Sequence, residues 1–395
     1  FAKSNRRPKA DLSTMSATPT HPNYSPGLEG VIGGITQIAQ ITSATSTLVY
    51  RGINVHELAE HSTYEDTVFL LLHGRLPSSQ EYKAFVQTLA DERNVPEDVL
   101  KAIRLCPKNM HPMDAMKVGY ALLSPYDPDY EAEPTDHEAN IRKATRIVAK
   151  AGVICCAYWR HKLGQEFVAP DPELRTAANF LYMLNGEKPD PETEKVMDAS
   201  LVLYAEHTYN ASTFANRVTV ATLSDLYSGI VSGIGTLKGP LHGGANEEAM
   251  KMILEIGTPE NAEPWLRDAL ATKKKVMGFG HREYKNGDSR AFYMTKIAKQ
   301  LGKKIGVTQW GEIADVLESI MINEKGIYPN VDFPSAYAYY LLNIPMELYT
   351  PIFVVARVAG WSAHAIEQLD NNRLIRPTCL YDGPQDVPYV PLSER

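Results

Sequence analysis

The amino-acid sequence predicts a mostly α-helical protein with one small β-hairpin near the N-terminus. Three observations support this prediction. Helix-like apolar runs follow one another along most of the chain, and capping residues, glycine or proline bound them. Strand and helix patterns do not alternate, and no repeat of fixed period is present. With 395 residues, 44% of them hydrophobic, the chain is long enough for two lobes or domains.

The chain begins with a polar and basic segment, and we expect residues 1–25 to be flexible. Its opening, FAKSNRRPKADLSTM, lacks the apolar run of a secretory signal. We interpret it as a transit-peptide remnant or as an added extension. Residues 35–52 (ITQIAQITSATSTLVYRG) are rich in Ile, Thr and Val, which predicts the small hairpin.

Helices are expected next, because each apolar run has a recognisable boundary. Residues 63–74 end at Gly74, and residues 78–92 open with the capping pattern Ser78-x-x-Glu81. A proline or a glycine bounds the later runs as well. Further helices are expected at 97–105, 137–164, 173–186, 190–207, 245–257, 289–301, 334–343 and 351–369.

Composition argues against several classes of function. The net charge is −7, and no basic stripe interleaved with aromatic residues suggests nucleic-acid binding. No apolar run approaches the roughly 20 residues of a membrane-spanning helix. The cysteines form no CxxC pair, which indicates free thiols in a reduced, cytosolic setting. They are Cys106, Cys155, Cys156 and Cys379.

A histidine flanked by glycines is the first candidate for chemistry. His242 lies in GPLHGGANEEAM, directly before the helix expected at 245–257. The positive end of a helix disfavours imidazolium, so we expect His242 to be neutral and able to donate a hydrogen bond. A histidine in a glycine turn is more often structural, so the motif alone does not establish a site.

Asp332 is the second candidate. It lies in YPNVDFPSAYAYY, just before a helix that Pro334 is expected to start, and that position favours the carboxylate form. An aspartate before a helix is usually only a cap. Beside a neutral proton donor, however, a carboxylate base suits proton abstraction next to a carbonyl.

Arginines near these motifs suggest an acidic substrate. His281 lies in GFGHREYKNGDSR, which also contains Arg290, and Arg376 lies in DNNRLIRP. Arg357 interrupts an apolar helix, where a charge needs a partner. Guanidinium groups bind carboxylates through two hydrogen bonds, so the set suggests a small polycarboxylate.

With these motifs in view, the sequence resembles the citrate synthase family from about residue 26 to the end. The resemblance is closest to the shorter bacterial and archaeal branch, which includes 2-methylcitrate synthases. Five motifs occur in the family's order and spacing: AEHTYNASTFANR (205–217), GPLHGGANEEAM (239–250), GFGHREYKNGDSR (278–290), YPNVDFPSAYAYYLLNIP (328–345) and DNNRLIRP (370–377).

The resemblance implies a role for each matching residue. His242 would hydrogen-bond the thioester carbonyl of acetyl-CoA, Asp332 would remove the methyl proton, and His281 would polarise the ketone of oxaloacetate. Water would then hydrolyse citryl-CoA. Acetyl-CoA would be a co-substrate, and neither a metal nor a permanently bound cofactor is expected. The groups that would hold the oxaloacetate carboxylates are His207, Arg290, Arg357 and Arg376.

Contacts with coenzyme A are also implied by the resemblance. The backbone of residues 276–280 and the side chain of Lys285 fall where the family holds the nucleotide and its phosphates. Many members carry arginine at the Lys285 position, and lysine keeps the charge but loses the two-pronged geometry. The backbone residues are Val276, Met277, Gly278, Phe279 and Gly280.

The family's architecture would give a two-domain helical fold. The large domain would comprise residues 26–242 with 340–395, and the small domain residues 243–339. The site would lie between them, and domain closure would exclude water. A cytoplasmic homodimer is expected, in which Arg376 reaches the partner's site. The Pro-rich end of the chain would pack as an extended arm on the partner.

Three other functions remain open at this point. A 2-methylcitrate synthase would use propionyl-CoA with the same residues, and DFPSAYAYY departs from the DFYSG pattern of dedicated citrate synthases in that direction. A citryl-CoA lyase would run the carbon–carbon cleavage instead. A non-catalytic helical scaffold is disfavoured, because every polar residue of the site is retained.

Overall fold

A computed structural model describes residues 24–395, apart from residues 43, 44, 282, 285 and 286. Residues 36–375 form one compact unit. Residues 24–35 and 376–395 belong to a second, small unit, which is described by itself. The expectation of a flexible segment at 1–25 therefore falls almost wholly outside the described residues.

The expected hairpin is present, and it is extended to a three-stranded antiparallel sheet. Strands β1 (Ala39–Thr42) and β2 (Thr47–Tyr50) pair with Ala39 opposite Tyr50. A short third strand, β3 (Ile53–Asn54), pairs with the end of β2. Alternate side chains of β2 are buried, which is the period that a sheet with one covered face requires.

The helices predicted from their caps are all present. Gly74 ends α2 in the left-handed conformation (φ 75°), and the Ser78–Glu81 capping box opens α3. The bounds are α2 Tyr64–His73, α3 Ser79–Asp91, α4 Glu97–Leu105, α6 His137–Leu163, α7 Thr176–Asn185, α8 Pro191–Tyr204, α11 Ala245–Ile256, α13 Ser289–Ile305, α15 Asp332–Leu341 and α16 Tyr349–Asp370.

The remaining helices carry weaker local signals. Pro264 lies inside α12, and α10 contains three glycines, which lower its intrinsic helix propensity. Packing explains two of those in α10: a Cβ on Gly233 would lie 3.1 Å from the Trp361 ring, and one on Gly229 would lie 2.2 Å from Asn216 Oδ1. These helices are α1 Val55–His61, α5 Pro112–Leu123, α9 Ala211–Val220, α10 Leu226–Leu237, α12 Pro259–Ala271 and α14 Gln309–Lys325.

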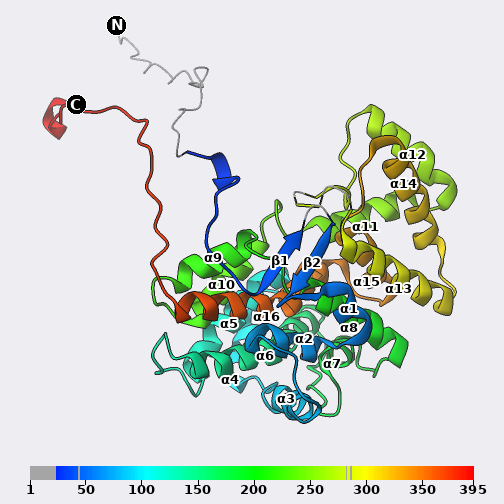
Figure 1. Cartoon of the computed structure of the whole chain (residues 1–395), viewed down its shortest axis with the longest axis horizontal. Helices are drawn as coiled ribbons and strands as arrows, with labels where there is room; N and C mark the ends of the chain where they lie inside the picture. The colour runs from blue at the N-terminus through cyan, green and yellow to red at the C-terminus, as the bar shows by residue number, and fades with distance from the viewer. Residues whose placement is uncertain (1–23, 43–44, 282, 285–286) are drawn as a thin grey trace, which may run out of the picture. The chain divides into compact units, whose positions relative to one another are not determined.

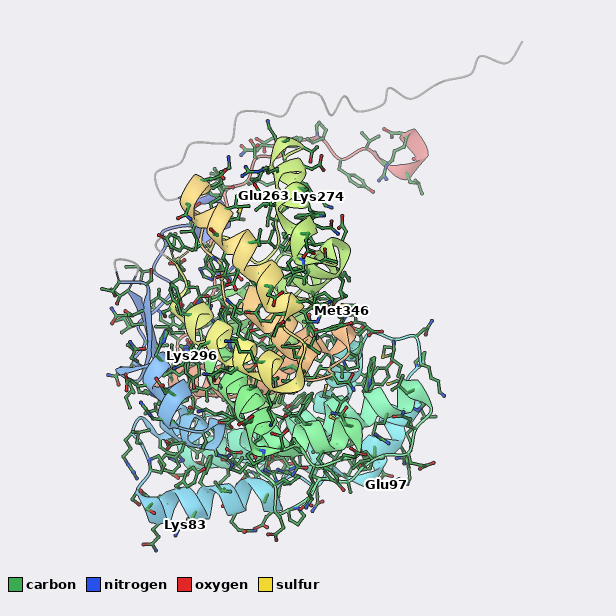
Figure 2. The ribbon with its side chains drawn as sticks, turned by 90° about the vertical axis from the view of Figure 1, so that its right-hand side faces the viewer. Lys83, Glu97, Glu263, Lys274, Lys296 and Met346 are labelled. Carbon is green, nitrogen blue, oxygen red and sulfur yellow. The ribbon has the colours of Figure 1, made fainter. Side chains whose placement is uncertain are left out.

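Helix α16 is the central element of the compact unit. It is buried over almost its whole length and packs against α2, α6, α8, α9 and α10. Helices α11 to α15 pack on one another and lie together on one side of the unit (Figure 1). Helix α13 connects this group to the N-terminal region, where its Lys296 pairs with Glu60 of α1 at 3.4 Å (Figure 2). The predicted boundary between a large and a small domain stays a prediction.

Short 3-10 turns complete the described elements. They lie at Pro26–Leu28, Ser124–Tyr126, Met346–Leu348 and Leu392–Glu394. Residues 376–391 form neither helix nor strand, as the proline content of 376–395 predicted, whereas Leu392–Glu394 forms a 3-10 turn. No helix in the described part of the chain is long and apolar enough to cross a membrane.

Candidate active site

His242 lies in the turn between α10 and α11, two residues before the N-cap Gly244. The backbone N–H of Ser212, in the first turn of α9, donates to its Nε2 at 3.3 Å. Nε2 therefore accepts, and Nδ1 carries the hydrogen of the neutral ring. Burial, followed by the nearby charge of Arg357, lowers the pKa of His242 to about 4. The neutral form was predicted from the end of α11, and burial and Arg357 favour it as well.

Asp332 is the first residue of α15, which begins two residues earlier than predicted. The hydroxyl of Tyr204, the last residue of α8, donates to Oδ1 of Asp332 at 2.7 Å. Burial raises the pKa of Asp332, although the hydrogen bond from Tyr204 and the charge of Arg290 lower it. The net effect is a raised pKa for Asp332, and the expectation that the helix end favours the carboxylate stays a prediction. A raised pKa suits a general base.

His207 and His281 lie against each other, with ring centroids 5.2 Å apart. Nε2 of His207 lies 3.1 Å from the hydroxyl of Tyr284. The backbone N–H of Glu283 donates to Nδ1 of His281 at 3.0 Å, so Nε2 of a neutral His281 carries the hydrogen. Burial, then the charge of Arg290, lowers the pKa of His207 well below its ordinary value. His207 is therefore kept neutral, and a neutral His281 can donate through its Nε2–H.

Arg290 lies in the first turn of α13 and is almost fully buried. Its Nε and Nη2 donate to the two carboxylate oxygens of Asp288, at 3.0 and 2.8 Å. The second oxygen of Asp288 also accepts from the backbone N–H of Val331, the residue before Asp332. Burial lowers the pKa of Arg290, but Asp288 outweighs it, so the guanidinium is charged. One buried carboxylate thus fixes both Arg290 and the start of α15.

Arg357 lies in the middle of α16 and is 1% exposed. The sequence predicted that this charge needs a partner, and its Nε donates to the carbonyl oxygen of Tyr204 at 2.7 Å. Its guanidinium carbon also lies 4.7 Å from the ring centroid of Phe353, which is a cation–π distance. Burial lowers the pKa of Arg357, and the carboxylate of Glu206 opposes this effect most strongly.

Residues 276–280 run beside the segment that leads into α15. The backbone N–H of Asn330 donates to the carbonyl of Gly278 at 2.9 Å, and its side-chain amide donates to the carbonyl of Gly280 at 2.9 Å. Gly278 has φ 79°, and a Cβ there would lie 2.7 Å from Cβ of Phe333. Only glycine fits that position. Val276 is buried, and Met277 and Phe279 are half-buried, whereas Lys285 lies outside the described residues.

The structure brings most of the predicted residues into one neighbourhood. The charge of Arg357 acts on His207, His242 and Asp332. Arg376 is exposed and belongs to the terminal unit, so its relation to this neighbourhood stays a prediction. Within the part of the chain that the structure describes, no three His, Cys, Asp or Glu side chains gather as a metal site requires.

Several site residues were not predicted from the sequence. Ser212 and Glu206 lie inside the motif AEHTYNASTFANR, and Tyr284 and Asp288 lie inside GFGHREYKNGDSR, so their position in a motif was the available signal. Tyr204 ends an apolar helical run, where a buried residue is usually part of the core. Asp288 is the N-cap of α13, and capping alone explains its position.

The fold and the site are those of an all-α acyltransferase. Residues 27–378 match the family described as citrate synthase, C-terminal domain. The chain therefore belongs to the citrate synthase family, as the five motifs indicated. The expected helical fold is confirmed by solved structures of the same family.

The relatives include proteins named citrate synthase and proteins named 2-methylcitrate synthase. Citrate synthase 2 of Bacillus subtilis is 46% identical over 370 residues, which cover 93% of this chain and 98% of that protein. 2-Methylcitrate synthase 1 of Corynebacterium glutamicum is 40% identical and covers 93% of this chain and 98% of that protein. The citrate synthase of Thermoplasma acidophilum, solved with carboxymethyl coenzyme A and oxaloacetate, has a TM-score of 0.87 at 35% identity, with 94% and 99% of the chains covered.

Proposed function

We propose that this protein condenses acetyl-CoA with oxaloacetate and water to give citrate and free CoA. One observation carries the proposal: Tyr204 donates to Asp332 through its hydroxyl and accepts from the buried Arg357 through its carbonyl. His242 is oriented by the backbone N–H of Ser212, so its Nδ1–H is left to donate. A carbon acid next to a thioester needs this combination of hydrogen-bond donor and base. The oxaloacetate and CoA analogue bound to the Thermoplasma relative support the choice of substrates.

Enolisation is the first step. The carboxylate of Asp332 removes a proton from the methyl group of acetyl-CoA, and the electron pair moves onto the thioester oxygen. Nδ1–H of His242 donates to that oxygen, because Nε2 accepts from the backbone of Ser212. The donor is in place before charge develops, which is the arrangement that stabilises an enolate.

Carbon–carbon bond formation follows. The enolate carbon attacks the ketone carbon of oxaloacetate, and the ketone oxygen takes a proton from Nε2–H of His281. Water then attacks the thioester carbonyl of citryl-CoA, and CoA leaves as the thiol after protonation. Arg290, Arg357 and His207 hold the oxaloacetate carboxylates in this scheme, and Lys285 with the backbone of residues 276–280 holds coenzyme A.

The third arginine is proposed to come from a second copy of the chain. Arg376 begins the terminal segment 376–395, which does not belong to the unit that contains the site. In a homodimer with shared sites, Arg376 would reach the partner's oxaloacetate, and the extended end of the chain would pack on the partner. A cytoplasmic location is proposed from the four free cysteines.

2-Methylcitrate synthesis from propionyl-CoA is the second candidate function. The observation that favours it is Pro334, which is buried in the first turn of α15, two residues after Asp332. Tyrosine is common at this position in dedicated citrate synthases, and losing its ring would leave space for one more carbon. The relative from Corynebacterium glutamicum is consistent with this activity.

A thiol-release assay tests the proposal. Free CoA should appear from acetyl-CoA only when oxaloacetate is added, because the enolate needs its acceptor. Equal release with and without oxaloacetate would identify a simple thioesterase. Parallel kcat/KM values with propionyl-CoA then distinguish the two acyl-chain specificities.

A further inference from the structure

The segment after α8 is attached to α16 by three successive contacts. The carbonyl of Tyr204 accepts from Nε of Arg357 at 2.7 Å, and the carbonyl of Ala205 accepts from the backbone N–H of Gly360 at 3.1 Å. Oε1 of Glu206 then lies 2.9 Å from Nε2 of His364. Residues 357, 360 and 364 share one face of α16, because they are spaced by three and four positions. The segment therefore lies along that face.

The Glu206–His364 pair is fully buried, with neither side chain exposed to solvent. Burial lowers the pKa of His364, but the carboxylates of Glu206 and Glu367 outweigh it and leave this pKa raised. The ring of Tyr209 covers the same imidazole at 5.3 Å between centroids. A buried carboxylate is costly unless a cation or a donor holds it, so His364 satisfies Glu206.

Glu206 lies close to a residue of the site. Its other oxygen, Oε2, has no hydrogen-bond partner among the described residues, and a Cβ on Gly360 would lie 2.3 Å from it. Glu206 is also the carboxylate that acts most strongly on Arg357. The described hydrogen bond of Arg357 uses Nε, which leaves its two Nη groups for a carboxylate.

Two carboxylates can therefore compete for one guanidinium. A buried acid released from its partner turns to the nearest cation, and an arginine fork matches a carboxylate well. The charge of Glu206 acts on Arg51 and on Arg357, but Nε and Nη2 of Arg51 already donate to the carbonyl of Leu71. Without His364, an internal Glu206–Arg357 pair would therefore occupy the groups that oxaloacetate needs. Arg290 differs, because it already has its own carboxylate in Asp288.

We propose that His364 is a positioning residue of the dicarboxylate site: it holds the carboxylate of Glu206 and so leaves the guanidinium of Arg357 to the substrate. This inference rests on the proposed function, since it takes Arg357 as a ligand of oxaloacetate. His364 touches neither substrate, and its effect reaches the site through Glu206.

A double-mutant cycle with equilibrium binding of oxaloacetate tests the proposal. His364→Gln should weaken oxaloacetate binding by about tenfold or more, a change that corresponds to a lost charge-assisted contact. KM for acetyl-CoA should stay within about twofold, since the change concerns the other substrate. Adding Glu206→Gln should restore most of the affinity, because the competing carboxylate is then gone. A purely structural role predicts no such rescue.

The matched control is His61→Gln, which alters an exposed histidine that lies 3.8 Å from Glu57. It should leave oxaloacetate binding unchanged. If His364→Gln does not fold, Glu206→Gln alone decides, and its oxaloacetate affinity should equal or exceed that of the wild type. Unchanged affinity in folded His364→Gln, absent rescue, or a tenfold loss in Glu206→Gln would overturn the inference. A wild-type protein that binds no oxaloacetate would instead reject the proposed function.

Discussion

The hydroxyl of Tyr204 donates a 2.7 Å hydrogen bond to Oδ1 of Asp332, while the carbonyl of the same residue accepts from Arg357. Tyr204 thus links the proposed base to a proposed substrate ligand. Its ring also packs edge-on against Phe353, with centroids 4.7 Å apart. With Oδ1 held in this way, the other oxygen of Asp332 is the one left for proton abstraction.

Tyr204→Phe tests this link. The hydrogen bond lowers the pKa of Asp332, so removing it should raise that pKa further. The base must be ionised, and the acid limb of kcat/KM for acetyl-CoA should move to higher pH by up to about one unit, the scale of one hydrogen bond to a charged group. Tyr339→Phe, which removes a hydroxyl bonded to Ser200, is the control. An acid limb that stays in place would refute the link.

Asp332→Asn should abolish condensation and leave oxaloacetate binding intact. The replacement is nearly isosteric but has no basic oxygen, and losing a positioned base typically costs about 10²–10⁴ in rate. Steady-state kcat and oxaloacetate titrations check the two halves of this prediction. Near-normal kcat in a folded variant would eliminate Asp332 as the base.

The lowered pKa of His242 should make the stability of the fold depend on pH. Its pKa falls from 6.5 to about 4 on folding, so between these values the unfolded chain binds more protons than the folded one. This contribution is fully present above pH 6.5 and is lost as the pH falls toward 4. Between pH 7 and 5 the loss is at most about 2 kcal/mol.

Urea unfolding at pH 7 and pH 5 measures this effect. The free energy of unfolding of His242→Asn should change less between the two pH values than that of the wild type. The exposed His61→Asn variant should keep the wild-type difference. If the free energy of unfolding changed equally between the two pH values in His242→Asn and in the wild type, His242 would not be kept neutral by the fold.

If Arg376 reaches the partner's oxaloacetate, each active site contains residues of both subunits. Subunits with Arg376→Ala and subunits with Asp332→Asn should each form nearly inactive homodimers. A mixed dimer would gather both lesions in one site and leave the other site complete, so about half of the wild-type activity per dimer should return. Background activity in verified mixed dimers would contradict a shared site.

Local signals were sufficient for most helices, because a cap acts within one turn. The Ser78–Glu81 box and the left-handed Gly164 mark helix ends that the structure confirms. Helix α10 has an Asp225 cap, but its glycines obscured the helical pattern, and Gly233 is explained by the close approach of Trp361. Here tertiary contacts outweigh the intrinsic propensity.

The motifs could be recognised in the sequence, but the contacts between site residues and their pKa values could not be predicted from it. Tyr204 and Asp332 are separated by 128 positions, and Glu206 and His364 by 158, so no local pattern connects them. The predicted charge state of Asp332 considered only the nearby helix end. Its pKa depends also on burial, which the surrounding fold creates.

We expect acyl-chain choice to depend on the first turn of α15. Pro334 and Ser335 are both buried there, two and three residues after Asp332. Proline at this position also has a backbone reason, because it is favoured in a first helical turn. If its side chain borders the acyl methyl, one additional methylene is worth about 1–3 kcal/mol, or roughly 10–200-fold in specificity.

Pro334→Tyr separates the two explanations. We expect wild-type turnover of propionyl-CoA within about 200-fold of acetyl-CoA in kcat/KM, and we expect the variant to shift this ratio toward acetyl-CoA because the ring fills the space for the extra carbon. Both substrates are measured on both proteins, with thermal unfolding to verify the fold. Tyr340→Phe, which changes a partly exposed side chain later in α15, is the control. A folded Pro334→Tyr variant with an unchanged ratio would leave Pro334 as a helix-start residue and remove this basis for 2-methylcitrate synthesis.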